Sequence, residues 1–199
     1  MRQLCLMFLF CFISGTVLGQ HSSTAPIFDL VGPDLGDLHP EEDFSVLRRR
    51  ERRIEYSFRT SGLDFNTPHT VWVVAFNNPQ FCLSTPCSFA DFPFVPGHDP
   101  RAMATFVNAG GGVSNGTDGY FVGTVDKTRK GASSTEVVLG PGLLNPKTAD
   151  IRLVIRSHGE PGSFEDLLAA LKSYRGACNA DNAVQPFPCR DYQISIHLP

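Results

Sequence analysis

The sequence predicts a mainly β protein, an antiparallel β-sandwich of about seven strands with one short amphipathic helix and two local disulfides. After Ile54, short runs rich in β-branched and aromatic residues alternate with turn-forming Gly, Pro, Asn and Asp. One later segment instead has the period of an amphipathic helix. The predicted strands are residues 54–60, 70–76, 102–107, 120–126, 135–139, 150–157 and 192–198.

The pattern of apolar residues separates a central strand from two half-exposed ones. Residues 70–76 are apolar on both faces, so we expect this strand to be covered on both sides. Residues 150–157 and 192–198 alternate instead, which predicts one core face and one solvent face for each strand. The solvent-facing set is predicted to be Arg152, Arg156, His158, Gln193, Ser195 and His197.

A helix is predicted to start after Ser163, a favourable N-cap with Asp166 three positions later, and to stop at Gly176. Its apolar positions recur at helical spacing and form a single stripe: Phe164, Leu167, Leu168 and Leu171. We expect this stripe to pack on the sheets, with Leu168 buried.

Residues 1–19 are predicted to be a secretory signal peptide. A short n-region with Arg2 precedes an apolar run that is too short to span a bilayer, and small residues follow up to Gly19. Cleavage after Gly19 would leave a secreted, extracellular chain with no membrane span.

The four cysteines outside this segment are expected to form two disulfides in the oxidising secretory route. Four cysteines allow three pairings, and we favour Cys82 with Cys87 and Cys178 with Cys189, since each pair brackets a Pro-containing loop. A four-cysteine zinc site is the alternative, but paired C-x-x-C spacing is missing.

Residues 20–53 are predicted to be a linker or a propeptide that precedes the domain at 54–199. The segment is first acidic and looks extended or weakly ordered, and it ends in an arginine-rich run. Arg50-Glu51-Arg52-Arg53 fits the specificity of furin-like processing proteases, and cleavage after Arg53 would free Ile54. The alternative is a solvated basic lead-in to the first strand.

The glycine-rich stretch at residues 108–119 is predicted to be a flexible surface loop. It contains Asn115-Gly116-Thr117, an N-glycosylation acceptor.

Charge and motifs weaken several function classes. A net charge of −3 gives no basic surplus for binding nucleic acid. The chain has no G-x-S-x-G, H-E-x-x-H or P-loop motif, and we predict neither a cofactor nor a metal as the leading hypothesis.

Two groups of residues are candidate ligand-binding sites. Arg152, Arg156, His158, Gln193 and His197 would together offer donors to an anionic group, or two imidazoles to copper or zinc, if their strands are neighbours. The alternative is an ordinary hydrogen-bonded surface.

The second candidate lies in the long connection at residues 77–101, where Phe92 and Phe94 belong to a Phe/Pro-rich series. These rings are either an exposed aromatic recognition surface or part of the core.

Several segments resemble a group of small secreted proteins of uncharacterised function. They are Thr60-Ser61-Gly62-Leu63, residues 69–79, the Cys82 to Cys87 loop, Gly140-Pro141-Gly142-Leu143, residues 155–159 and residues 193–197. The order of strand, Gly-Leu turn, long apolar strand and late His-Gly is also distantly similar to chordin-type (CHRD) extracellular β-sandwich modules. Neither resemblance implies catalytic residues.

The sequence therefore favours a secreted, non-catalytic binding or structural module for an extracellular protein or a glycan. The alternative is a secreted hydrolase or His-metal enzyme that is activated by cleavage after Arg53.

Overall fold

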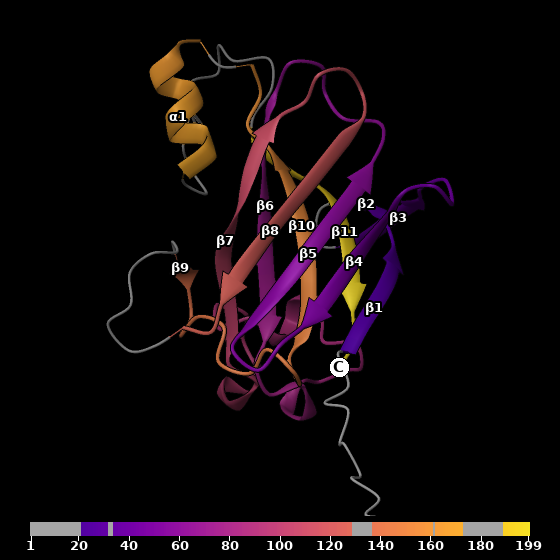
Figure 1. Cartoon of the computed structure of the whole chain (residues 1–199). Helices are drawn as coiled ribbons and strands as arrows, with labels where there is room; N and C mark the ends of the chain where they lie inside the picture. The colour runs from indigo at the N-terminus through magenta and orange to yellow at the C-terminus, as the bar shows by residue number, and fades with distance from the viewer. Residues whose placement is uncertain (1–20, 32–33, 129–136, 161, 173–188) are drawn as a thin grey trace, which may run out of the picture.

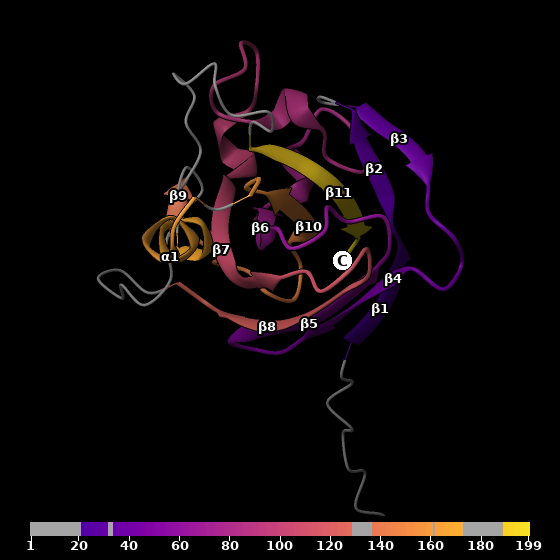
Figure 2. The ribbon, with the colours of Figure 1, turned by 90° about the horizontal axis from the view of Figure 1, so that it is seen from above.

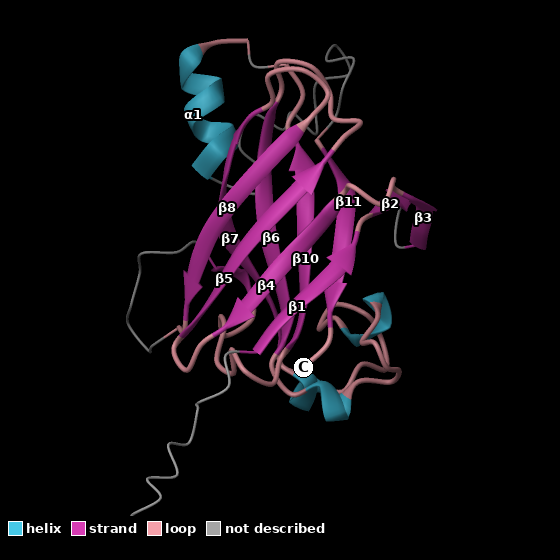
Figure 3. Ribbon diagram, turned by 45° about the vertical axis from the view of Figure 1, so that its right-hand side comes forward, coloured by secondary structure: helices cyan, strands magenta, loops and turns pink. Residues whose placement is uncertain are grey.

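The computed structural model describes residues 21–31, 34–128, 137–160, 162–172 and 189–199. The described chain is mainly β and forms two antiparallel sheets that face each other, with one α-helix at the side (Figures 1 and 3). The mainly β prediction is confirmed. No helix in the described ranges is long and apolar enough to cross a membrane.

The smaller sheet has four strands in the order β1-β4-β5-β8. Their bounds are β1 His21–Pro26, β4 Phe44–Arg49, β5 Arg53–Thr60 and β8 Gly119–Asp126.

The larger sheet has seven strands in the order β3-β2-β11-β10-β6-β7-β9. Their bounds are β3 Asp34–Leu38, β2 Phe28–Val31, β11 Arg190–His197, β10 Asp150–Ser157, β6 Pro68–Phe76, β7 Ala104–Val113 and β9 Val137–Leu139. Seen from above in Figure 2, this sheet curves around the core, and the long connection between β6 and β7 lies on its outer side.

One hydrophobic cluster fills the space between the sheets, and it includes Leu47, Ile54 and Phe58 from one sheet and Val73 and Leu153 from the other. A second cluster lies on the outer face of the seven-stranded sheet and includes Trp72, Val74, Phe76, Phe92 and Val154. Because the larger sheet is packed on both faces, every residue of β6 is buried, which confirms the prediction of a strand covered on both sides.

The connection from β6 to β7 carries three 3-10 turns: η1 Pro79–Phe81, η2 Phe89–Asp91 and η3 Pro100–Ala102. The Cys82–Cys87 disulfide lies in this connection, as predicted. The predicted partner of Cys189, Cys178, falls outside the described residues, so that pairing stays a prediction.

Between Gln20 and Arg53 the described chain is extended, one of the two predicted alternatives, and it contributes strands to both sheets. β1 pairs with β4, β4 pairs with β5, and β2 pairs with β11. Ile27 and Leu47 are fully buried between the sheets. Ile54 therefore marks no structural boundary.

The glycine run also differs from its prediction, since Gly110, Gly111 and Gly112 belong to strand β7. A bulge shifts the register of β7 against β6 here, and Gly110 has a φ of +116°. A Cβ on Gly111 would collide with the backbone oxygen of His69. The glycines allow close strand pairing rather than loop flexibility.

The helix α1, Phe164–Lys172, begins after Ser163 as predicted, and the hydroxyl of Ser163 accepts a hydrogen bond from the backbone of Asp166 at 3.1 Å. The predicted end at Gly176 lies outside the described residues. The stripe is less buried than expected: Leu167 and Leu171 are half-buried, and Phe164 and Leu168 are exposed. The buried residue of the helix is Ala170, which is not part of the stripe.

Candidate functional site

A mostly apolar groove lies on the outer face of the seven-stranded sheet. Its volume is about 930 Å³, near the upper end of the roughly 300–1,000 Å³ range of small-molecule sites. The floor is formed by strand residues that include Val74, Phe106, Val154, Ile194 and Ile196. The connection between β6 and β7 forms one wall, and Leu30, Leu35 and Val138 from three other strands also line the groove.

Three aromatic rings of the connection line this wall. The rings of Phe92 and Phe94 are stacked, with centroids 5.4 Å apart, and Phe89 packs against both at 5.7 Å and 5.6 Å. Phe92 is only 5% exposed and packs on Phe76 and Phe106, whereas Phe94 is 59% exposed. The wall thus has a buried base and a free outer surface.

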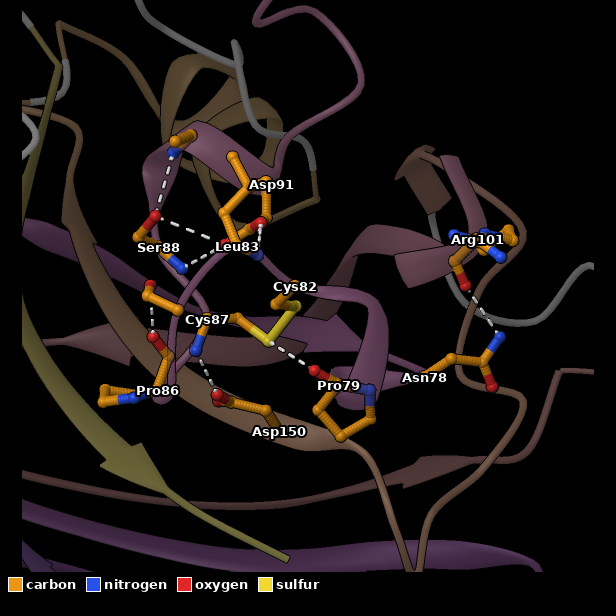
Figure 4. Close-up of a disulfide and its surroundings, with 12 residues drawn as sticks. Asn78, Pro79, Cys82, Leu83, Pro86, Cys87, Ser88, Asp91, Arg101 and Asp150 are labelled. Carbon is orange, nitrogen blue, oxygen red and sulfur yellow. Dashed lines mark hydrogen bonds between the residues drawn. A yellow bond between two sulfur atoms is a disulfide. The ribbon is translucent and has the colours of Figure 1, made fainter. Parts of the chain in front are cut away.

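Polar contacts hold the wall in place. The Asp91 carboxylate accepts hydrogen bonds from the backbone N–H groups of Leu83 and Ser88, both at 2.7 Å. The backbone N–H of Cys87 donates to Oδ2 of Asp150 at 2.9 Å, which ties the disulfide loop to the start of β10 (Figure 4). The groove is therefore largely formed before any ligand arrives.

Arg152 is the main cationic group of the groove. Its side chain projects from β10 on the groove side and is 12% exposed. The guanidinium carbon lies 5.2 Å from the centroid of the Phe76 ring, and burial lowers the pKa of Arg152, although the charge of Asp150 opposes this. Two acidic residues also line the groove: Asp34, which is exposed on β3, and Asp191, which bonds to Arg156 at 2.6 Å.

The structure brings three of the predicted binding residues together, since Phe92, Phe94 and Arg152 all line this groove. Of the two alternatives for these rings, the core applies to Phe92, whose ring packs into the outer cluster, and exposure applies to Phe94. Arg156 is beside the groove through its contact with Asp191.

The predicted solvent face of β11 is wrong. Gln193, Ser195 and His197 are buried between the sheets, while Ile194 and Ile196 face the groove. The hydroxyl of Thr60 donates to the Gln193 amide oxygen at 2.7 Å, and Ser45 bonds to both Ser195 and His197 at 2.7 Å. The four-stranded sheet therefore supplies polar partners that let these side chains be buried.

The two imidazoles of the metal hypothesis do not meet. His197 pairs with Ile151 at one end of β10, whereas His158 follows Ser157 at the other end. At a rise of about 3.3 Å per residue, the two histidines lie about 20 Å apart. They also face opposite sides, because His158 is buried against the hydroxyl of Thr70, which also accepts a hydrogen bond from the indole of Trp72 on the outer side of β6.

His197 and Ser45 have the spacing of a base and a nucleophile, but both are buried. Burial, together with the charge of Arg49, lowers the pKa of His197 to about 4. Arg49 itself is buried and donates to four backbone oxygens, of Pro146, Ala149, His197 and Leu198. This arrangement stabilises the packing of the two sheets and offers no access to a substrate.

The other predicted sites are on the surface. Asn115 is exposed after the end of β7, so the acceptor for N-glycosylation is accessible. Arg50 and Arg53 flank the tight turn between β4 and β5, where the N–H of Arg50 donates to the oxygen of Arg53 at 2.8 Å. A protease that needs an extended substrate would have to open this turn.

The sequence does not predict most of the residues on the groove floor, nor the residues of β2 and β3 that line the groove. The alternation in residues 192–198 predicts that Ile194 and Ile196 face the core, whereas both line the groove, and Leu30 and Leu35 lie in the segment predicted to be extended or weakly ordered. The short apolar alternation of Phe28 and Leu30 is the signal that indicates β2.

No family model, curated protein or solved structure matches this chain.

Proposed function

We propose that this protein is a secreted, disulfide-stabilised β-sandwich that binds a small, mostly apolar molecule in the groove and performs no catalysis. The observation that carries the proposal is an apolar groove of about 930 Å³ with an exposed aromatic wall and a floor supported by a second hydrophobic cluster. Burial of apolar surface would supply the binding free energy.

The signal-like N-terminus, the even number of cysteines after it and the Cys82–Cys87 disulfide support secretion. A second disulfide between Cys178 and Cys189 belongs to the same proposal.

The groove favours an apolar ligand over the glycan or extracellular protein expected from the sequence. A glycan needs many hydrogen-bonding groups, and the lining is dominated by Val, Leu, Ile and Phe side chains. The concave shape of the groove suits a small molecule better than it suits a flat protein surface.

Titration with the neutral fluorescent dye N-phenyl-1-naphthylamine tests the proposal. The only tryptophan, Trp72, is buried in the outer cluster that supports the floor, so energy transfer from it reports dye in the groove. We expect saturable binding with one dye per chain.

The matched variants are Phe94→Ala and Phe65→Ala. The side chain of Phe65 is 62% exposed, a fraction similar to the 59% of Phe94, but Phe65 does not line the groove. Phe94→Ala should weaken dye binding about two- to tenfold through loss of ring contacts, and Phe65→Ala should leave it unchanged. Absence of saturable binding, or equal loss in both variants, would contradict the proposal.

A further inference from the structure

We propose that the ligand of the groove is an amphiphile whose apolar body lies on the aromatic wall and whose carboxylate pairs with Arg152. This inference rests on the proposed function and specifies the ligand's chemistry.

The guanidinium of Arg152 has donors that the described residues leave unused. Its Nε is buried and has no hydrogen-bond partner. Among the described residues, two buried carboxylates lie near it: Asp91, which acts on Arg152 through its charge, and Asp150, whose Oδ1 is 3.9 Å from Nε, too far for a hydrogen bond. The same Oδ1 atom is also buried without a partner, while Oδ2 accepts from the backbone of Cys87.

A buried cation without hydrogen-bond acceptors is costly, and its nearest ring, Phe76, offers only a cation–π contact. A carboxylate accepts two parallel hydrogen bonds from a guanidinium, which no neutral group of similar size does as well. The lining around Arg152 is apolar, so such a pair would be shielded from water and strengthened.

The acidic residues of the groove do not replace this acceptor. Asp191 already bonds to Arg156, and Asp34 lies on the exposed rim strand, where solvent screens its charge. Among the residues that line the groove, Arg152 is therefore the cation whose buried Nε has no hydrogen-bond acceptor, and it lies in an apolar groove with an aromatic wall. It fits a monocarboxylic acid with a hydrocarbon body.

Three ligands with the same chain and different head groups test the inference: dodecanoate, dodecan-1-ol and dodecylamine, each used to displace the neutral dye near neutral pH. We expect dodecanoate to bind at least about tenfold more tightly than the alcohol, the effect of a hydrogen bond to a charged group. The amine should bind no better than the alcohol.

Variants assign the selectivity to one side chain. Arg152→Gln should reduce dodecanoate binding to the level of the alcohol, and a far-UV circular dichroism spectrum like that of the wild type would show that the variant is folded. Arg152→Lys should retain part of the selectivity. The control is Arg59→Gln, because Arg59 is exposed on the four-stranded sheet and should not affect binding.

The outcomes separate the inference from the proposed function. Equal binding of acid and alcohol by the wild-type protein, or tighter binding of the amine, would overturn the inference while the groove still binds apolar ligands. Failure of the dye and all three ligands to bind would overturn both. The wild-type comparison remains decisive even if Arg152→Gln does not fold.

Discussion

Phe92 and Phe94 are two residues apart, and their rings are stacked at an interplanar angle of 9°, yet one ring is buried and the other is exposed. Phe92 anchors the connection between β6 and β7 on the outer face of the sheet, and Phe94 covers Phe92 from the solvent side. Phe92 therefore supports the wall, and Phe94 is the ring that a ligand can contact. The sequence alone does not distinguish these two roles.

Phe92→Ala should lower the free energy of unfolding by about 3–5 kcal/mol, because it leaves a cavity between Phe76 and Phe106. Phe94→Ala should cost much less, since its ring is largely in solvent. Urea denaturation followed by Trp72 fluorescence measures both. Similar losses in the two variants would show that the wall is not anchored in this way.

Leu168→Ala should cost less than about 1 kcal/mol, because Leu168 is 37% exposed on α1. Leu153→Ala removes a fully buried side chain from the core between the sheets and should cost about 2–5 kcal/mol. Comparing the two urea midpoints tests the described burial. A loss of several kcal/mol at Leu168 would mean that the helix stripe is covered.

His39 should make the protein less stable as the pH rises. Its Nδ1 lies 2.9 Å from Asp43 and its Nε2 lies 2.8 Å from Asp29, and both nitrogens donate only when the imidazole is protonated. Burial alone lowers the pKa of His39, but the hydrogen bonds and charges of Asp29 and Asp43 together raise it above 6.5.

The stabilisation is therefore complete below pH 6.5 and is lost as the pH rises through the raised pKa of the folded state. His39→Gln should remove this decline. Thermal unfolding across neutral and mildly alkaline pH measures it, and an unchanged slope in the variant would refute the assignment.

His197 should make the protein less stable as the pH falls, the opposite of the effect of His39. Burial and the charge of Arg49 lower its pKa to about 4, so the folded protein keeps this imidazole neutral while the unfolded chain protonates near pH 6.5. Stability should fall by about 3 kcal/mol as the pH drops from the unfolded-state value to the folded-state value.

His197→Gln should be less stable at neutral pH but lose less on acidification. His21→Gln is the control, since His21 is exposed on β1. Burial also lowers the pKa of His69, so part of the acid sensitivity should persist in the variant. Acid sensitivity equal to the wild type in His197→Gln would contradict this origin.

The sequence predicts the strands of this protein better than it predicts their faces. The bounds of β10 match the prediction of 150–157, and β6 contains the predicted 70–76. A period of two shows that Ile194 and Gln193 point to opposite sides, but it does not show which side is the core. Here both sides are packed, and Thr60 from the other sheet makes the polar side the inner one.

The site was predictable only in pieces. Aromatic residues in a long connection indicate Phe94, and alternation indicates that Arg152 shares a face of β10 with Arg156. The meeting of Phe94 and Arg152 in one groove depends on how the connection folds back over β10, through Asp150 and the backbone of Cys87. No local pattern encodes that long-range contact.

The most direct test of the central claim is an intermolecular NOE experiment on the full chain with labelled phenylalanine and added dodecanoate. The proposed complex predicts NOEs from the ligand's methylene protons to the rings of Phe89 and Phe94, and none to Phe65, which does not line the groove. NOEs to Phe65 without Phe89 and Phe94, or no intermolecular NOEs at all, would contradict binding in the groove.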